Sequence, residues 1–81
     1  MTTSLLEAAL GEHVILVAVP AEDAGGLARH GLLAGRGILV EQDAPFGGPR
    51  LVRVGSRRVA VPRALARKIC VSPADGAGEG R

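Results

Sequence analysis

The sequence has almost no aromatic side chains and a single cysteine, and both shortages exclude functions. Phe46 is the one aromatic residue among 81, and there is no Trp or Tyr. Proteins that bind single-stranded nucleic acid commonly stack bases on aromatic rings, so the sequence argues against a stacking platform of that kind. The lone Cys70 cannot supply an internal disulfide framework or a cysteine-rich zinc site.

The chain is also short and lacks a long apolar run. Its 81 residues form at most one domain with a thin core, which cannot wall a substrate cleft of ordinary size. The longest apolar run, residues 14–21, has eight residues and contains Pro20, whereas a membrane-spanning helix needs about 20. Residues 1–10 have no basic segment and do not resemble a secretory signal. We therefore expect a small cytoplasmic protein that is not an enzyme.

Charge is divided sharply along the chain, although the net charge is only +2. Residues 1–49 carry six acids and two bases, whereas residues 50–71 carry seven bases and no acid. This asymmetry predicts one basic edge that faces an anionic partner. The acidic first half would repel a nucleic acid backbone, so carboxylates on a protein are favoured over phosphates. A small β-barrel that binds nucleic acid stays as the alternative interpretation.

Short apolar segments separated by turn residues predict a mainly β fold, with a small closed or nearly closed barrel of five strands. The expected strands are residues 14–19, 36–43, 51–54, 57–61 and 69–71. Residues 1–71 form the expected domain. Residues 72–81 contain Gly, Ala and charge with nothing to bury, which predicts a disordered tail.

One short helix is expected after the first strand, over residues 20–30. Its ends are favourable, with acids at the N-terminus and Arg29 and His30 at the C-terminus, but Gly25 and Gly26 each cost about 1 kcal/mol relative to Ala. Helical turns are expected near both ends of the chain. A capping box at residues 4–7 begins the first, and Pro62 begins the second with Leu65 facing the core.

The dipeptide Gly55-Ser56 predicts a tight hairpin, because a type II′ turn places glycine at its first central position. That register pairs two valines, Val52 and Val59, on the buried face. It also opposes Arg53 and Arg58 on the outer face. Like charges directly opposed destabilise a hairpin by up to about 1 kcal/mol, so this pair either extends into solvent or faces an anionic partner.

Apolar residues in two predicted loops are further candidates for partner contact. Such residues either fold under the barrel or stay exposed, and the sole aromatic in the Ala44–Pro49 turn suits a binding hot spot. The predicted partner interface comprises Leu32, Leu33, Pro45, Phe46, Arg53 and Arg58.

No constellation of catalytic or metal-binding residues is visible in the sequence. His13 and His30 are the candidate metal ligands, but His13 adjoins Glu12 on a strand, where neighbouring side chains point to opposite faces. No pair has the helical i, i+4 spacing of a zinc site. Cys70 is interpreted as a small residue that fills a strand position. We therefore expect no resident metal, cofactor or catalytic site.

Three segments, in this order, resemble the FeoA family of small SH3-like barrels. Residues 30–35, His-Gly-Leu-Leu-Ala-Gly, are similar to the family's Leu-Gly-Leu-x-Pro-Gly turn. Residues 43–49, Asp-Ala-Pro-Phe-Gly-Gly-Pro, resemble its Ala-Pro-x-Gly-Gly-Pro hairpin. Residues 59–71 follow its ending, an apolar strand, a turn with Ala and then Ile-x-Val. The sequence departs from the family at His30, usually aliphatic, and at Ala34, usually Pro.

The resemblance implies an SH3-like barrel and an accessory role in bacterial ferrous iron uptake. Family members act on FeoB, a membrane iron transporter with a cytoplasmic GTPase domain, so contact with a membrane is expected only through that partner. A related domain ends the iron-dependent repressors of the DtxR type, and a detached regulatory domain is therefore a second alternative. The sequence is also compatible with a weak homo-oligomer.

Overall fold

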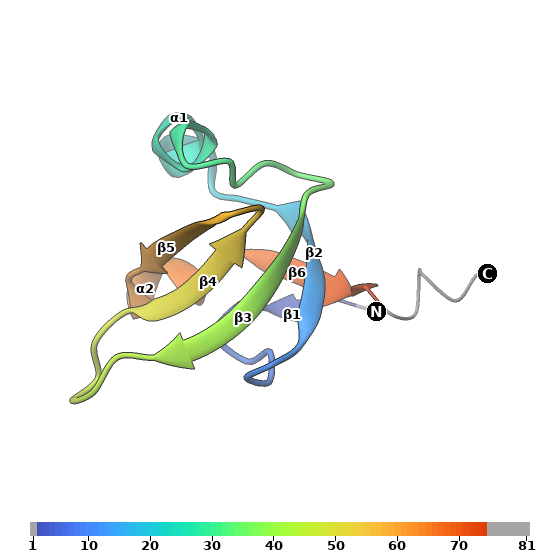
Figure 1. The fold of residues 1–81 in the computed structure, drawn as a ribbon. Coiled ribbons are helices and arrows are strands. Elements are labelled where there is room, and N and C mark those ends of the chain that lie inside the picture. The colour runs from blue at the N-terminus through green and yellow to red at the C-terminus, as the bar shows by residue number, and fades with distance from the viewer. Residues whose placement is uncertain (1, 75–81) are drawn as a thin grey trace.

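Six antiparallel strands wrap into a partly open barrel in a computed structural model that describes residues 2–74 (Figure 1). The sheet order is β1-β6-β2-β3-β4-β5. The strands are β1 (Thr3–Ser4), β2 (His13–Ala18), β3 (Gly37–Asp43), β4 (Arg50–Val54), β5 (Arg57–Val61) and β6 (Cys70–Pro73). The mainly β, SH3-like prediction is thus confirmed, with six strands where five were expected. Each of the two end strands, β1 and β5, has one paired neighbour within the described residues.

The additional strand is the N-terminal segment, where a helical turn was predicted. Half of the capping box is present, because the Glu7 amide donates to Ser4 Oγ at 3.2 Å. The Glu7 carboxylate, however, accepts from Thr3 Oγ1 at 2.6 Å. The Leu5 amide donates to the Ile69 carbonyl at 2.8 Å, and the Leu5 side chain is completely buried. Burial of Leu5 against β6 therefore outweighs the local preference for a helix.

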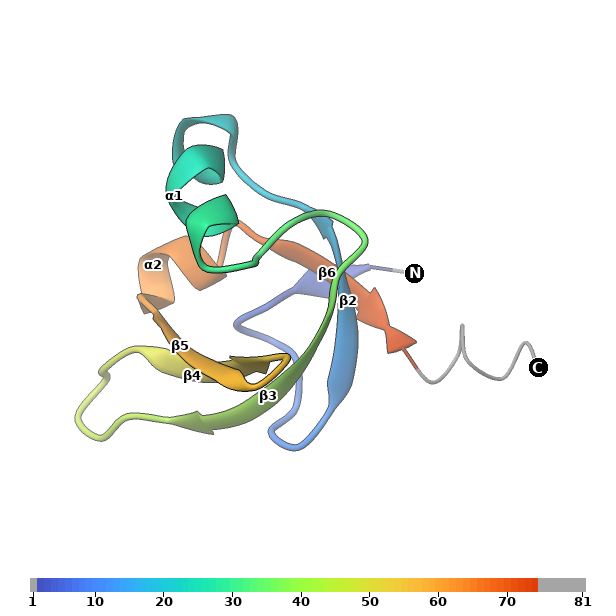
Figure 2. The same ribbon diagram turned by 45° about the horizontal axis from the view of Figure 1, so that its top comes forward.

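The helical segments are short and lie close together (Figure 2). A 3-10 turn, η1 (Ala21–Asp23), leads into α1 (Ala24–Arg29), which follows β2 as predicted. α2 (Arg63–Ala66) follows Pro62 as predicted, but Ala66 is its fully buried residue and Leu65 is only partly buried. None of the helices in the described part of the chain is long and apolar enough to cross a membrane.

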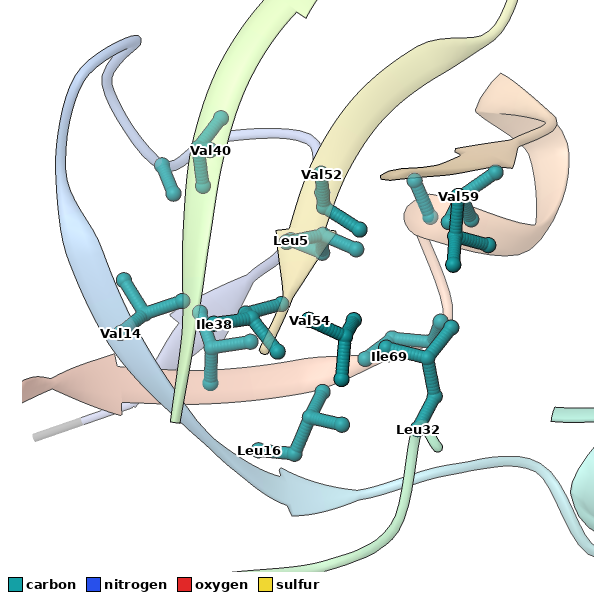
Figure 3. Close-up of a cluster of buried hydrophobic side chains, with 14 of the residues drawn as sticks. Leu5, Val14, Leu16, Leu32, Ile38, Val40, Val52, Val54, Val59 and Ile69 are labelled. Carbon is teal, nitrogen blue, oxygen red and sulfur yellow. The ribbon is translucent and has the colours of Figure 1, made fainter. Parts of the chain in front are cut away.

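The predicted hairpin register is confirmed in every pair. Val52 lies opposite Val59 and Arg53 opposite Arg58. Gly55 has a φ of +63°, while Ser56 has no positive φ, as a type II′ turn requires. The valines of this hairpin enter the core drawn in Figure 3. The core consists of Leu5, Ala8, Val14, Leu16, Leu27, Leu32, Ile38, Val40, Val52, Val54, Val59, Val61, Ala66, Ile69 and Val71.

β6 extends two residues beyond the predicted end of the barrel at Val71. Ser72 pairs with Ile15 and Pro73 with Val14, so both belong to the sheet. The prediction of a disordered tail otherwise concerns residues 75–81, which lie outside the described residues.

A β-bulge in β3 decides which residues of that strand face the core. Val40 pairs with Val52, and the next pair is Gln42 with Leu51, so β3 has one residue more than β4 at this point. Strict alternation would place Asp43 on the same outer face as Glu41. The extra residue reverses the alternation and brings Asp43 opposite Arg50, on the inner side.

Arg50 is the buried charged residue of the described chain, at 6% exposure, and its guanidinium connects three segments. Its Nε and Nη2 donate to the two carboxylate oxygens of Asp43 at 2.8 and 3.1 Å. Its Nη1 donates to the carbonyls of Leu5 and Ala8 at 3.0 and 2.6 Å. The side chain therefore fastens the N-terminal loop to the end of the β3–β4 hairpin.

We expect Arg50→Met to lower the free energy of unfolding by about 3 kcal/mol, because it leaves two buried carbonyls without a hydrogen-bond donor and Asp43 without its ion-pair partner. Urea denaturation measures this change. The matched control is Arg53→Met on the same strand, whose side chain is 40% exposed. A surface ion pair contributes at most about 1 kcal/mol, so the control should lose far less. Equal losses would contradict the structural role of Arg50.

The two glycines of α1 generate a second prediction. A Cβ built at Gly25 or Gly26 meets no atom within 4 Å, so neither position is held open by packing within the described chain. Gly25→Ala and Gly26→Ala should each raise the free energy of unfolding by about 0.5–1 kcal/mol, because Ala has the higher helix propensity. Thermal unfolding followed by circular dichroism measures the gain, and a loss would show a contact at that position.

Candidate functional site

The predicted pair of opposed arginines is bridged by an acid from the neighbouring strand. Glu41 of β3 accepts from Arg53 Nε at 2.7 Å through Oε2 and lies 2.8 Å from Arg58 Nε through Oε1. The hydrogen bond from Arg53, with the charges of both guanidinium groups, lowers the pKa of Glu41 despite the opposing effect of desolvation. The expected repulsion is thus relieved within the chain, and one net positive charge remains on the cluster.

Phe46 is fully exposed at the tip of the β3–β4 hairpin, with 103% relative accessibility. The sequence left open whether it packs under the barrel, and the structure excludes that role. Its φ of +60° lies in the left-handed region, which costs a non-glycine residue roughly 1 kcal/mol or more. The turn imposes this conformation through bonds between Ala44 N and Pro49 O (2.9 Å) and between Gly48 N and Pro45 O (3.1 Å).

Gly48 cannot be replaced in this turn without a shift of the backbone. A Cβ at this position would lie 2.8 Å from the Ala44 Cβ and 3.2 Å from the Pro45 carbonyl oxygen. The presence of glycine in the segment that resembles the family hairpin therefore has a steric reason. This segment closes a tight loop that leaves Phe46 exposed to solvent.

The residues of the predicted interface do not form one patch, and one of them is buried. Leu32 is only 1% exposed and belongs to the core, where its side chain lies beside Ile69 (Figure 3). Leu33 beside it is 50% exposed. This loop lies at the opposite end of the barrel from the turn with Pro45 and Phe46 (Figures 1 and 2).

Two further residues near the Phe46 hairpin were not singled out from the sequence. Leu10 is 53% exposed in the loop between β1 and β2, which lies toward the same end of the barrel (Figure 1). The neighbouring Gly11 amide donates to the Val40 carbonyl at 2.6 Å, which ties this loop to β3. Arg50 was counted only as one base of the basic edge, although its position directly after the turn was a signal for an anchoring role.

The candidate metal ligands lie apart. His13 is exposed on β2, beside a shallow depression of about 350 Å³ that Leu39 and Arg53 also line. His30 is exposed at the end of α1. Across residues 2–74, no group of three or more His, Cys, Asp or Glu side chains could hold a metal ion. Cys70 is exposed on β6, so it fills a strand position without joining the core.

Acid should weaken the fold through the two bridging carboxylates. The hydrogen bond from Arg50 is the main cause that lowers the pKa of Asp43 below its usual 3.8, as Arg53 does for Glu41 below 4.5. A group whose pKa is lower in the folded state stabilises the fold above its unfolded pKa. That contribution is lost as the pH falls through the folded pKa.

We therefore expect the free energy of unfolding to fall as the pH is lowered below about 4.5. Urea denaturation at a series of pH values between 6 and 2 measures the decline. Asp43→Asn should be less stable at pH 6 and should show a shallower decline. An identical pH dependence in both proteins would contradict the role of the Asp43 carboxylate.

Solved structures of two FeoA proteins share this fold. An iron uptake regulatory protein (FeoA) is 30% identical, with 89% of this chain and 96% of that chain covered and a TM-score of 0.77. The FeoA protein from Chlorobium tepidum is 25% identical, with 88% and 70% covered and a TM-score of 0.80. None of the curated proteins matches the chain.

A protein that is not named as an FeoA protein, and whose structure contains bound zinc, has the same fold. ScaR with bound Zn²⁺ is 23% identical, with 88% of this chain but only 36% of that chain covered and a TM-score of 0.78. At that identity the likeness concerns the fold alone. The FeoA domain family, in contrast, matches residues 3–73, from the first residue of β1 to the last residue of β6. The chain therefore belongs to the FeoA domain family.

Proposed function

We propose that the chain is a cytoplasmic, non-enzymatic accessory protein that docks on the cytoplasmic, GTPase-bearing part of an FeoB-type iron transporter. Membership of the FeoA domain family implies an accessory role in ferrous iron transport. The observation that carries the docking proposal is the full exposure of Phe46, the sole aromatic residue, at the tip of an anchored hairpin. Contact with the membrane would then be indirect, through the transporter.

The Phe46 hairpin has the properties of a preorganised contact. Its ring packs on no core residue, and the left-handed backbone holds it outside the barrel. Because Arg50 fixes the base of the hairpin through Asp43, little conformational entropy is lost when the ring enters a pocket. Leu10, which is also exposed, lies toward the same end of the barrel in the separate loop between β1 and β2 (Figure 1). A partly apolar protein surface fits this end of the barrel.

The alternative of a nucleic-acid-binding barrel is weakened by the ion pairs. Four of the seven bases in residues 50–71 face Asp43 or Glu41, namely Arg50, Arg53, Arg58 and Arg63, the last at 3.9 Å. Bases that are already paired offer less free charge to phosphates. The second alternative, a detached regulatory domain of the DtxR type, is not separated from the first by the likeness to ScaR, which concerns the fold alone.

We expect Phe46→Ala to weaken binding to the isolated cytoplasmic domain of the transporter by about 1–2 kcal/mol, as the loss of a desolvated aromatic anchor does. Isothermal titration calorimetry measures the change. Leu33→Ala, the truncation of a half-exposed apolar residue at the opposite end, is the control and should bind like the parent. Circular dichroism checks that both variants keep the fold.

A gel shift with random duplex and single-stranded DNA separates the alternatives. The docking proposal predicts no salt-sensitive shift, whereas a nucleic acid binder would show one, with the salt slope reduced by about 1 for each lost phosphate contact. A DNA shift without transporter binding would overturn the proposed function. Equal losses in the Phe46 and Leu33 variants would place the docking surface elsewhere.

A further inference from the structure

A groove of about 240 Å³ lies between α1 and the edge strand β5, away from the Phe46 hairpin. One wall is the backbone of β5 and the start of α2, and the other is the face of α1. Apolar side chains dominate the lining, with Asp23 and His30 as its ionisable residues. The lining comprises Asp23, Gly26, Leu27, His30, Val59, Ala60, Val61, Pro62 and Leu65.

The β5 wall of this groove presents unpaired backbone groups. β5 pairs only with β4 within the described residues, so its other side is free. In a two-residue hairpin the pair next to the turn, Val54 and Arg57, exchanges hydrogen bonds, and every second pair after it does the same. The amides and carbonyls of Arg58 and Ala60 therefore point away from β4. No loop or cap within residues 2–74 bonds to them.

On the α1 wall of the groove, a glycine contributes no side chain. Gly26 lines the groove, and no atom of the described chain lies within 4 Å of a Cβ built there. Any other residue except proline would improve the helix propensity of α1, and its side chain would occupy the groove. Gly25, its neighbour, is equally open but does not line the groove. Glycine at position 26 thus keeps space for a strand beside β5.

The charge around this edge selects an acidic occupant. Residues 57–68 contain five bases and no acid, namely Arg57, Arg58, Arg63, Arg67 and Lys68. Arg57 and Arg58 are exposed on the edge strand itself, and Arg58 shares Glu41 with Arg53, so that cluster keeps a net positive charge. A second copy of this chain would bring its own Arg57 and Arg58 to the same edge. Repulsion between them disfavours self-pairing.

We propose that this groove binds an extended acidic segment of a partner protein, which adds to the barrel as a strand beside β5. Its backbone pairs with Arg58 and Ala60. Alternate side chains of an added strand point to opposite faces. One set is apolar and enters the groove against Leu27 and Leu65. The other set is acidic and lies beside Arg58 on the outer face. This surface is separate from the Phe46 hairpin, and the proposal does not depend on the transporter's identity.

A capped peptide of alternating Glu and Val tests the proposal by titration into isotope-labelled protein of full length. NMR should show shift changes centred on β5 and α1, with intermolecular backbone contacts to Arg58 and Ala60. The same peptide with Lys in place of Glu should bind at least about tenfold more weakly, because it meets like charge. Shift changes confined to the outer face at Arg53, or equal binding of both peptides, would overturn the proposal.

The two glycines of α1 supply a matched pair of variants. Gly26→Leu should abolish binding because its side chain fills the groove, and Gly25→Leu should bind the peptide like the parent. Both substitutions face open space, so both proteins should fold, which circular dichroism checks. Equal affinity in the two variants would show that the groove is not the binding site.

N-methylated peptides distinguish strand addition from simple charge attraction. Only one edge of the added strand faces β5, and the amides of a strand point alternately to its two edges. Two series of peptides, one methylated at the odd-numbered amides and the other at the even-numbered amides, should therefore differ in affinity. One series should lose about tenfold or more in affinity, because its amides can no longer donate to β5, and the other should retain it. Equal effects of both series would refute a β-strand mode. Dimerisation of the free chain through β5, detected by sedimentation, would replace the acidic segment by a second copy and also overturn the proposal.

Discussion

The buried guanidinium of Arg50 is the contact on which the arrangement of this small barrel depends. Four hydrogen bonds leave it, two to the carboxylate of Asp43 and two to the carbonyls of Leu5 and Ala8. A charged side chain at 6% exposure is tolerated only when its hydrogen-bond donors are satisfied. Here those donors connect Arg50 to Leu5 and Ala8, which lie 45 and 42 positions earlier in the sequence. The N-terminal loop, which has little regular structure of its own, is held over the core in this way. The same bonds fix the base of the hairpin that carries Phe46.

The β-bulge after Val40 makes both ion-pair clusters compatible with one strand. Because it reverses the alternation, Glu41 faces outward to Arg53 and Arg58, whereas Asp43 faces inward to Arg50. Without the additional residue, both acids would lie on the outer face and Arg50 would have no carboxylate partner. The two acids of β3 thus pair with four of the seven bases in residues 50–71 and offset two of their positive charges. A surface that looks strongly cationic in sequence is only moderately so in the folded chain.

Two separate surfaces follow from this arrangement. One end of the barrel presents a rigid turn with an exposed ring, suited to an apolar pocket of a partner. The side between β5 and α1 presents unpaired backbone groups in a groove bordered by bases, suited to an extended acidic segment. An accessory protein of 81 residues can in this way contact a large partner at two places. Two moderate contacts that are engaged together give higher affinity than either alone, provided that the geometry permits both.

The sequence by itself determined the strand pattern, the Gly55-Ser56 hairpin with its register, and the helix after β2, because these depend on local turn chemistry and on short apolar runs. It also identified the family from motifs that are turns with steric requirements, such as the one at Gly48. Only the tertiary structure decided that burial of Leu5 places the N-terminal segment in the sheet as the additional strand β1. It also decided that Leu32 is buried while Phe46 is exposed. The bridge that Glu41 forms between Arg53 and Arg58 was likewise visible only in the structure. Each of these depends on contacts between segments far apart in the chain or on a bulge that changes the face of a strand. No local sequence pattern encodes such long-range contacts or the position of the bulge.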